Sequence, residues 1–344
     1  MTIGGEFAPL QIGNVRLENP VLAAPIAGFT DSVFRGLVRE LGGCGLIYTE
    51  MVSASGWIDG RIEPRRLRGV PDEPKPLGVQ LWDREEAPLE EAARRLVDMG
   101  VTVIDLNFGC PKRRIMGKQA AGAHLLRDPA TVGRLVAAAV RGAGQTPVTA
   151  KMRLGASCAK LTAVEVARAA VASGARAVTV HGRTADQSYG TPSSRAEIAA
   201  VVAAVDVPVI ANGDISDAAS ALATMRETGA AAVMVARAAL HRPWVFAQIS
   251  AALRGMPVPA APSLWEQREL LLRHHALVVD HEGDPHGTVL MRKFACRYLG
   301  GTPGARTFRE HVCRAENAAD FRRIVDEYFP VESTADVGSD EQAA

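Results

Sequence analysis

The chain has 344 residues, of which 47% are hydrophobic, and a formal net charge of +1. This length and apolar content suffice for one large core and a modest second domain. The five cysteines are odd in number and show no Cys-x-x-Cys spacing, so we expect neither a disulfide framework nor a metal site.

No basic segment followed by an apolar run opens the chain, and no apolar stretch approaches the roughly 20 residues of a membrane helix. We therefore expect a cytoplasmic monomer without a signal peptide or membrane segment.

Short apolar, β-rich runs recur from Pro20 to Arg237 and predict parallel strands buried on both faces. The predicted strands are Val21–Pro25, Leu46–Val52, Leu77–Trp82, Val103–Asn107, Val148–Arg153, Ala177–His181, Val207–Asn212 and Ala231–Ala236.

Helical patterns separate these strands, and several end in a glycine that suits a left-handed helix stop, as at Gly100, Gly174 and Gly229. The predicted helices include Glu85–Met99, Thr131–Arg141, Thr162–Ser173, Ser194–Ala203 and Ala218–Thr228. Eight strand–helix units over roughly 220 residues predict an α/β fold of the (β/α)8 TIM barrel type. An open doubly wound sheet is the alternative, but the first strand leads into VLAAPIAG and not into a Gly-x-Gly-x-x-Gly turn.

The proline-rich segment GMPVPAAP at Gly255–Pro262 marks a domain boundary. We assign residues 1–254 to the barrel and 263–330 to a small all-α domain, with helices at Trp265–Asp280, Val289–Leu299 and Ala318–Phe329. Residues 331–344 contain four acids and no base, and we expect a disordered acidic tail. Without those acids, the rest of the chain has a formal net charge of +5.

Polar side chains gather at the predicted strand ends, where barrel enzymes place their reactive groups. Buried singly, each would need a partner, because an unpaired polar group inside a protein costs several kcal/mol. A structural hydrogen bond explains any one of them about as well as a functional role does, whereas a site explains the whole set better. The set is Gln80, Asn107, Cys110, Lys151, Arg153, His181, Arg183, Asn212 and Asp214.

Small residues follow the last two predicted strands, in IANGDI at Ile210–Ile215 and AAVMVARAAL at Ala231–Leu240. They allow backbone N–H groups to approach a phosphate at the start of a helix. The alternative is that Gly213 serves only a tight turn.

The ordered motifs of this chain resemble those of the dihydrouridine synthases, and most closely those of the bacterial B type. The resemblance covers nearly the whole chain, including MRKFACRYLGG at Met291–Gly301 in the helical domain. The motifs are APIAGFTDSVFR at Ala24–Arg35, YTEMV at Tyr48–Val52, NFGCP at Asn107–Pro111, KMRLG at Lys151–Gly155, VHGRT at Val180–Thr184, NGDI at Asn212–Ile215 and ARAALHRPW at Ala236–Trp244.

The resemblance implies FMN-dependent reduction of the C5–C6 bond of selected uridines in tRNA, with NADPH or NADH as reductant. A hydride would pass from flavin N5 to uracil C6, and the thiol of Cys110 would give a proton to C5. A buried apolar role is the alternative for this cysteine.

The other roles that the resemblance implies concern charge and positioning. Lys151 would stabilise negative charge, His181 would stand between cofactor and substrate, and Asn107 would hold the uracil edge, with Arg153 and Arg183 on the substrate side. The expected cofactor contacts are Pro25, Ile26, Ala27, Gln80, Lys151, His181, Asn212, Gly213, Asp214, Ala236 and Arg237.

Two positions depart from the family pattern. Ala236 stands where the family usually has glycine, and a positive φ there would cost on the order of 1 kcal/mol and weaken FMN retention. His241 also replaces a glycine that is common in similar turns.

Binding of tRNA would require basic side chains on the surface, although each basic cluster taken alone is better explained as a solvated face. The candidates are Arg61, Arg65, Arg66, Arg68, the Lys112–Arg114 segment, Lys118, Arg292, Lys293 and Arg297.

Two other functions remain open from the sequence. One is a flavin barrel that acts on a free pyrimidine or dihydroorotate, which the helical domain and NFGCP disfavour. The other is a tRNA-binding protein without catalysis, which Ala236 suggests and the set Cys110, Lys151 and His181 disfavours.

Overall fold

The computed structural model describes residues 8–61, 65–298 and 304–330, and the predicted acidic tail at 331–344 lies outside these ranges. The chain divides into two compact units. The first comprises Met1–Ala239 and Val245–Val258, and the second comprises Leu240–Trp244 and Pro259–Ala344.

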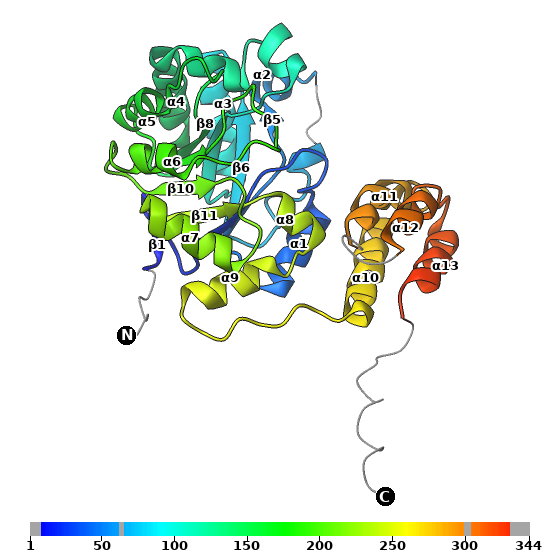
Figure 1. Cartoon of the computed structure of the whole chain (residues 1–344). Helices are drawn as coiled ribbons and strands as arrows, with labels where there is room; N and C mark the ends of the chain where they lie inside the picture. The colour runs from blue at the N-terminus through cyan, green and yellow to red at the C-terminus, as the bar shows by residue number, and fades with distance from the viewer. Residues whose placement is uncertain (1–7, 62–64, 299–303, 331–344) are drawn as a thin grey trace, which may run out of the picture. The chain divides into compact units, whose positions relative to one another are not determined.

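A closed parallel barrel forms the first unit (Figure 1). Its eight strands run in chain order, and the pairing of β4 with β6 and of β11 with β3 completes the ring. The predicted (β/α)8 barrel is therefore confirmed. The strands are β3 (Val21–Ala23), β4 (Leu46–Tyr48), β6 (Leu77–Trp82), β7 (Val103–Phe108), β8 (Val148–Arg153), β9 (Ala177–His181), β10 (Val209–Asn212) and β11 (Ala232–Val235), with the two-residue β5 (Val52–Ser53) beside β6.

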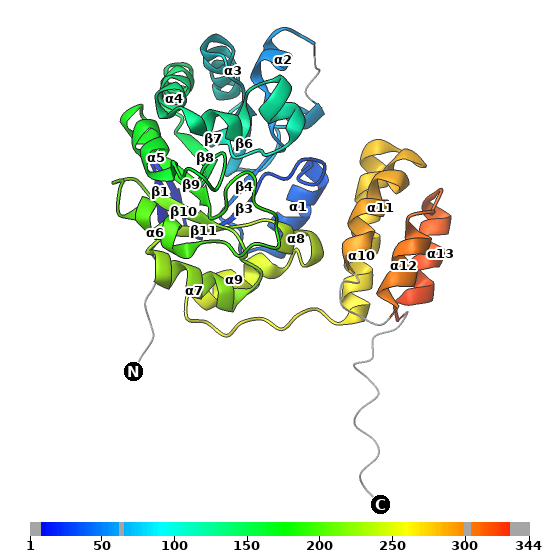
Figure 2. The ribbon, with the colours of Figure 1, turned by 45° about the horizontal axis from the view of Figure 1, so that its top comes forward.

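Helices surround the strands, as the view in Figure 2 shows. Most of them connect one barrel strand to the next, which parallel strands require. They are α1 (Ser32–Leu41), α2 (Ala54–Ile58), α3 (Glu86–Asp98), α4 (Pro129–Ala143), α5 (Ala163–Ala172), α6 (Arg195–Val202), α7 (Ala218–Thr228), α8 (Arg237–His241) and α9 (Val245–Leu253). Short 3-10 helices lie at Arg65–Leu67 and Gly122–Arg127, and one turn of π-helix lies at Arg114–Lys118.

Local signals in the sequence explain why helix α7 begins and ends where it does. The carboxylate of Asp217 accepts a hydrogen bond from the backbone N–H of Ser220, and the Ser220 hydroxyl accepts one from the Asp217 N–H. This capping box satisfies two of the N–H groups that a helix start leaves unpaired. At the other end Gly229 has a φ of 69°, a conformation that favours glycine.

An antiparallel hairpin that the sequence analysis did not predict precedes the barrel. Its strands are β1 (Leu10–Ile12) and β2 (Val15–Leu17). The buried Leu10, Ile12 and Leu17 belong to one apolar cluster with residues from β3, β4, β7, β9, β10 and β11. The hairpin therefore adds its apolar face to the core of the barrel.

The second unit contains the helices α10 (Leu264–Glu282), α11 (His286–Tyr298), α12 (Ala305–Val312) and α13 (Ala318–Tyr328). Its core is aromatic: the His275 ring stacks on Phe321 with 4.0 Å between centroids, and Phe294 and Phe308 are fully buried. Helix α12 was not predicted. No helix in the described ranges is long and apolar enough to cross a membrane.

Candidate functional site

The polar residues expected at the strand ends do lie at one end of the barrel. Asn107, Lys151, His181 and Asn212 stand in the carboxyl-terminal halves of their strands, β7 to β10. The register pairs Asn107 with Lys151, and His181 with Asn212. Paired residues of parallel strands face the same side of the sheet, and so do residues two apart along a strand. Because Lys151 pairs with Thr179 and Arg153 pairs with His181, all four side chains share the same face near the carboxyl end of the barrel, Asn107 with Lys151 and His181 with Asn212.

Cys110 follows β7 in a turn that is held from two sides. The Asn107 side-chain oxygen accepts hydrogen bonds from the backbone N–H groups of Gly109 at 3.0 Å and Cys110 at 2.9 Å. The Ala123 N–H donates to the Cys110 carbonyl at 3.1 Å. Gly122, with a φ of 59°, permits this approach because a Cβ there would lie 2.9 Å from the Cys110 carbonyl oxygen.

The thiols of Cys110 and Cys44 have different surroundings. Both residues retain partial exposure. Burial raises the pKa of the Cys44 thiol to about 12, and that thiol donates to the Leu46 carbonyl at 3.4 Å.

The Lys151 side chain points toward Asn212 on the neighbouring part of the barrel end. Its ammonium donates to the Asn212 side-chain oxygen at 3.1 Å, and the Asn212 amide donates to the Met234 carbonyl at 2.8 Å. Burial lowers the pKa of Lys151 to about 8, and the nearby Asp105 carboxylate opposes that shift. An anionic or carbonyl ligand beside the ammonium would favour its charged form.

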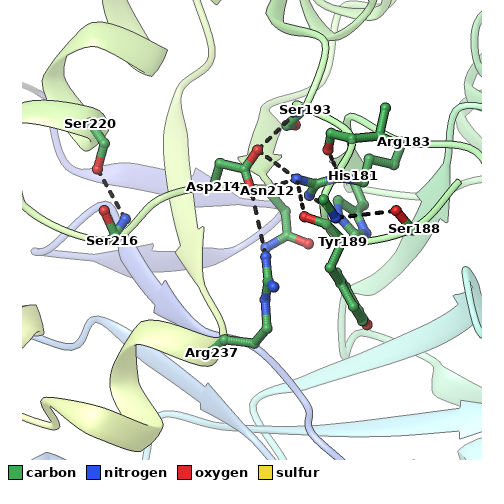
Figure 3. A network of polar contacts seen from close by, with 12 residues as sticks. His181, Arg183, Ser188, Tyr189, Ser193, Asn212, Asp214, Ser216, Ser220 and Arg237 are labelled. Carbon is green, nitrogen blue, oxygen red and sulfur yellow. Dashed lines mark hydrogen bonds and ion pairs between the residues drawn. The ribbon is translucent and has the colours of Figure 1, made fainter. Parts of the chain in front are cut away.

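A second cluster of contacts surrounds Asp214, just after β10 (Figure 3). One guanidinium nitrogen of the buried Arg183 donates to both Asp214 oxygens at 2.6 Å, and the Ser193 N–H donates at 2.9 Å. Arg237 lies 3.4 Å from the same carboxylate, and its guanidinium stands 4.2 Å from the centroid of the Tyr189 ring. The Asp214 carboxylate therefore joins the loops after β9, β10 and β11.

His181 is neutral in this environment. Burial, followed by the positive charges of Lys151, Arg153, Arg183 and Arg237, lowers its pKa to about 2. Its Nε2 lies 3.2 Å from an Arg183 nitrogen. Because arginine only donates, Nε2 is the acceptor and the ring proton belongs on Nδ1.

Gly213 forms the tightest part of this loop. Its φ is 122°, and a Cβ there would stand 2.9 Å from the Ser193 Cβ and 3.1 Å from the His181 ring. The next residue, Asp214, also has a positive φ of 53°. Both positions bring the backbone close to the rim, as a site for a phosphate-bearing ligand requires.

The expected cofactor contacts after β3 and β11 also lie at the carboxyl end of the barrel. Pro25, Ile26 and Ala27 follow β3 in a partly exposed loop, where the Ile26 N–H donates to the Thr30 hydroxyl. Ala236 is not among the described residues with positive φ, so the expected backbone strain is absent there.

Arg153 is almost fully buried, and its guanidinium donates to the carbonyls of Gly109 and Thr184. It therefore ties the Cys110 turn to the loop after β9. Among the basic surface candidates, Arg292 donates twice to the Ala315 carbonyl, and Arg66 bonds the Met51 carbonyl and pairs with Glu50.

The sequence analysis missed Asp105, Thr149, Tyr189 and Ser193. A charged residue inside the apolar run of β7 was a signal for Asp105, whereas nothing in the loop sequence singled out Tyr189 or Ser193. In the described part of the chain, no three His, Cys, Asp or Glu side chains gather as metal ligands would.

A closed parallel barrel with a thiol, a lysine and a neutral histidine at its carboxyl end defines a TIM-barrel enzyme. Residues 21–333 match the dihydrouridine synthase (Dus) family. A probable tRNA-dihydrouridine synthase of Rhodobacter capsulatus is 40% identical over 311 residues, which cover 90% of this chain and 94% of that protein. The tRNA-dihydrouridine synthase B of Pseudomonas aeruginosa is also 40% identical, over 90% of this chain and 92% of its own.

Among solved structures, morphinone reductase in complex with tetrahydroNAD matches 74% of this chain and 92% of its own, with a TM-score of 0.51 and 14% identity. That likeness concerns the barrel fold alone. The chain belongs to the dihydrouridine synthase family, a family of flavin oxidoreductases.

Proposed function

We propose that this protein reduces the C5–C6 double bond of specific uridines in tRNA, with FMN as cofactor and NADPH or NADH as reductant. Family membership supports the reaction class, and the names of the relatives support tRNA as the substrate. The observation that carries the proposal is the partly exposed Cys110, fixed by Asn107 in the same layer as Lys151.

The charges at the rim fit a phosphate-bearing flavin. Four cations act on His181, namely Lys151, Arg153, Arg183 and Arg237. Two carboxylates oppose them: Asp105 acts on Lys151, and Asp214 pairs with Arg183 and Arg237. The cluster thus has two more positive than negative charges, which suits a phosphate dianion.

Gly213 and the backbone around Ala236 would approach the phosphate, and Arg237 would neutralise it. Gln80, Lys151, His181 and Asn212, with the Pro25–Ala27 backbone, would line the ring of the flavin. When bound, FMN supplies a hydride for the C6 atom of the pyrimidine. The chain's own residues hold the pyrimidine and supply the proton.

Cys110 gives that proton to C5 of the uracil. Two backbone N–H groups of its turn donate to Asn107, so the Cα of Cys110 has a fixed place at the barrel end. Lys151 stabilises the negative charge that develops on the uracil as hydride arrives. The neutral His181 acts by its hydrogen bonds and not by its charge.

Asn107 has one N–H group on a weak acceptor that a substrate carbonyl would replace. One hydrogen of its amide binds Gln80 at 2.7 Å, while the thioether of Met51, a weak acceptor, lies 3.5 Å from the same nitrogen. A pyrimidine carbonyl would be a better partner than that sulfur. Arg153 and Arg183, for which we expected substrate contacts, use their guanidinium groups on backbone carbonyls and Asp214, so we assign them to loop positioning.

The helical unit would bind tRNA together with basic residues around the barrel end. The target uracil must leave the base stack to reach Cys110, as in enzymes that flip bases. Lys112–Arg114 and Lys118 follow the Cys110 turn directly, so they are placed to contact the phosphates beside an extruded uridine.

The experiment is to incubate the FMN-loaded protein and NADPH with unmodified tRNA transcripts and to map dihydrouridine position by position by mass spectrometry. Cys110→Ala should retain bound flavin and tRNA affinity but lose most product. Cys158→Ala is the matched control, because Cys158 is exposed and its backbone N–H donates to Asp186, which is not one of the site residues named above. Faster turnover of free uracil or dihydroorotate than of tRNA would overturn the proposal.

A further inference from the structure

Asp105 is a carboxylate inside the barrel that the reaction outlined above does not use. It stands on β7 in the run VIDLNF and is 1% exposed. One of its oxygens accepts from the Gln80 amide and the other from the Thr149 hydroxyl, each at 2.7 Å. The register pairs it with both residues across the neighbouring strands. A buried carboxylate with these partners has a fixed position.

This carboxylate at one end, and the backbone N–H groups of Gly109 and Cys110 at the other, fix the direction of the hydrogen bonds between them. Because an ionised carboxylate only accepts, the nitrogen end of the Gln80 amide must face Asp105. The oxygen end of Gln80 then faces Asn107 and accepts from its amide at 2.7 Å. The oxygen of Asn107 is in turn left to accept from the backbone N–H of Cys110 at 2.9 Å. Reversal of either amide would place two donors or two acceptors together.

We propose that Asp105 is a positioning residue for the reduction, which anchors the side-chain amides of Gln80 and Asn107 from inside the barrel and thereby holds the Cys110 turn in place. The role of Asp105 in catalysis rests on the proposed function, whereas the hydrogen-bond network follows from the observed contacts alone. Asp105 lies inside the barrel, so it acts on Cys110 only through two intervening side chains.

Asp105 has a second effect, on charge. Two titratable groups face it: Lys151 from β8 and the buried Tyr48 from β4. Burial raises the pKa of Asp105 to about 6, while Gln80, Thr149 and Lys151 oppose that shift. At neutral pH the carboxylate is therefore ionised and supports the charge on Lys151, whose pKa burial lowers to about 8.

A double-mutant cycle with Thr149 separates orientation from charge. In Asp105→Asn, the new amide can accept from Gln80 and donate to the Thr149 hydroxyl, so the direction of the network survives while the charge is lost. In Thr149→Val, the carboxylate still accepts from Gln80. A threonine hydroxyl both donates and accepts, so with Thr149 present either end of the amide at position 105 has a partner. In the double variant only Gln80 holds this amide, so the support of Gln80 is weakest there.

The first measurement uses the flavin-free protein, alkylated with iodoacetamide and followed at each cysteine by mass spectrometry, with the exposed Cys158 as internal standard. Each single variant should alkylate Cys110 within about threefold of the wild-type rate. The double variant should alkylate it at least about tenfold faster, because the turn loses its fixed acceptor. On loaded enzyme, kcat should fall about 100-fold in the double variant with an unchanged KM for tRNA.

The second measurement is the pH dependence of FMN affinity. Wild-type affinity should fall as Lys151 loses its proton near pH 8, and in Asp105→Asn this fall should begin at lower pH because the supporting anion is gone. Asp83→Asn is the matched control, since Asp83 is also a buried carboxylate, bonded to the Ser55 N–H at 2.7 Å. It should leave both the pH profile and the Cys110 rate unchanged.

Additive effects on Cys110 alkylation, or an FMN profile in Asp105→Asn that matches the wild type, would overturn the inference. The pH measurement needs only the single isosteric variant, so it decides even if the double variant is unfolded. A wild-type protein that forms no dihydrouridine would contradict the proposed function instead, and the alkylation cycle would still test the positioning.

Discussion

Substitution of Gly213 by alanine tests how much the tight loop after β10 contributes to stability and to cofactor binding. At a φ of 122° an alanine is strained by about 1–3 kcal/mol. Its Cβ would also stand 2.9 Å from the Ser193 Cβ and 3.1 Å from the His181 ring. Crowding of this kind in a packed region costs a further 1–3 kcal/mol, roughly.

Gly100→Ala provides the control, since Gly100 has a φ of 68° and no described atom lies within 4 Å of the place that an alanine methyl group would occupy. Its cost should be about 1–2 kcal/mol from the backbone alone. The free energy of unfolding, measured in urea, should therefore fall by about 1–3 kcal/mol more in Gly213→Ala than in Gly100→Ala.

Flavin affinity distinguishes a binding loop from a merely structural one. If FMN binding requires the native loop, Gly213→Ala should bind FMN about 10- to 100-fold more weakly than the wild type in a fluorescence titration. Gly100→Ala should bind FMN as the wild type does. Equal stability of the two variants together with native flavin affinity in Gly213→Ala would refute the argument from this loop.

Three further predictions concern charge. The pKa of Lys151 in the folded protein is about 8, below its ordinary value of 10.5. The folded protein is therefore most stable above pH 10.5, where Lys151 is neutral in both the folded and the unfolded chain, and this contribution to the free energy of unfolding is lost as the pH falls from 10.5 through 8. Relative to Lys151→Met, the FMN-free wild type should then lose up to about 3 kcal/mol between pH 10.5 and pH 7 in urea denaturation, and a pH-independent difference would contradict this. His181→Asn should slow tRNA reduction without moving the pH profile between 5.5 and 8.5, because the pKa of His181 lies near 2; a lost ionisation in that range would show the histidine to be charged. Lys118→Gln should weaken tRNA binding and reduce the slope of log affinity against log salt by about 1, and an unchanged slope would remove Lys118 from the phosphate contacts.

The strands of the barrel were predictable because their sequence and their environment agree. Three predicted ranges, Leu77–Trp82, Val148–Arg153 and Ala177–His181, have the bounds that the structure shows. Strands buried on both faces are continuous apolar runs, and their flanking glycines mark the turns. The β1–β2 hairpin was missed because its strands have three residues each and too little alternation to identify.

Helix α12 was not predicted because its sequence contains too few apolar residues. Its sequence, ARTFREHV, is mostly polar, and Phe308 and Val312 are its only large apolar residues. Both are fully buried, so tertiary packing makes this segment a helix. A pattern of two apolar residues four apart is too common to predict a helix by itself.

The candidate site was predictable as a set of residue types at strand ends, but its hydrogen bonds were not. Gln80 and Asp105 are 25 residues apart, and Thr149 lies a further 44 along the chain. Only the register of neighbouring strands brings them together. Family resemblance gave roles to residues that contact ligands, whereas a residue that acts through another has no motif of its own.

Burial separates these two kinds of residue at the barrel end. Asp105 and Arg183 are each 1% exposed, and their charged groups are bonded to other parts of the chain. Cys110 and Lys151 retain partial exposure and have donor capacity left for a ligand. A buried polar residue at a strand end whose charged group is bonded within the chain therefore supports a neighbour and does not itself contact the substrate. By this criterion Arg183, predicted as a substrate contact, supports the loop that carries Asp214.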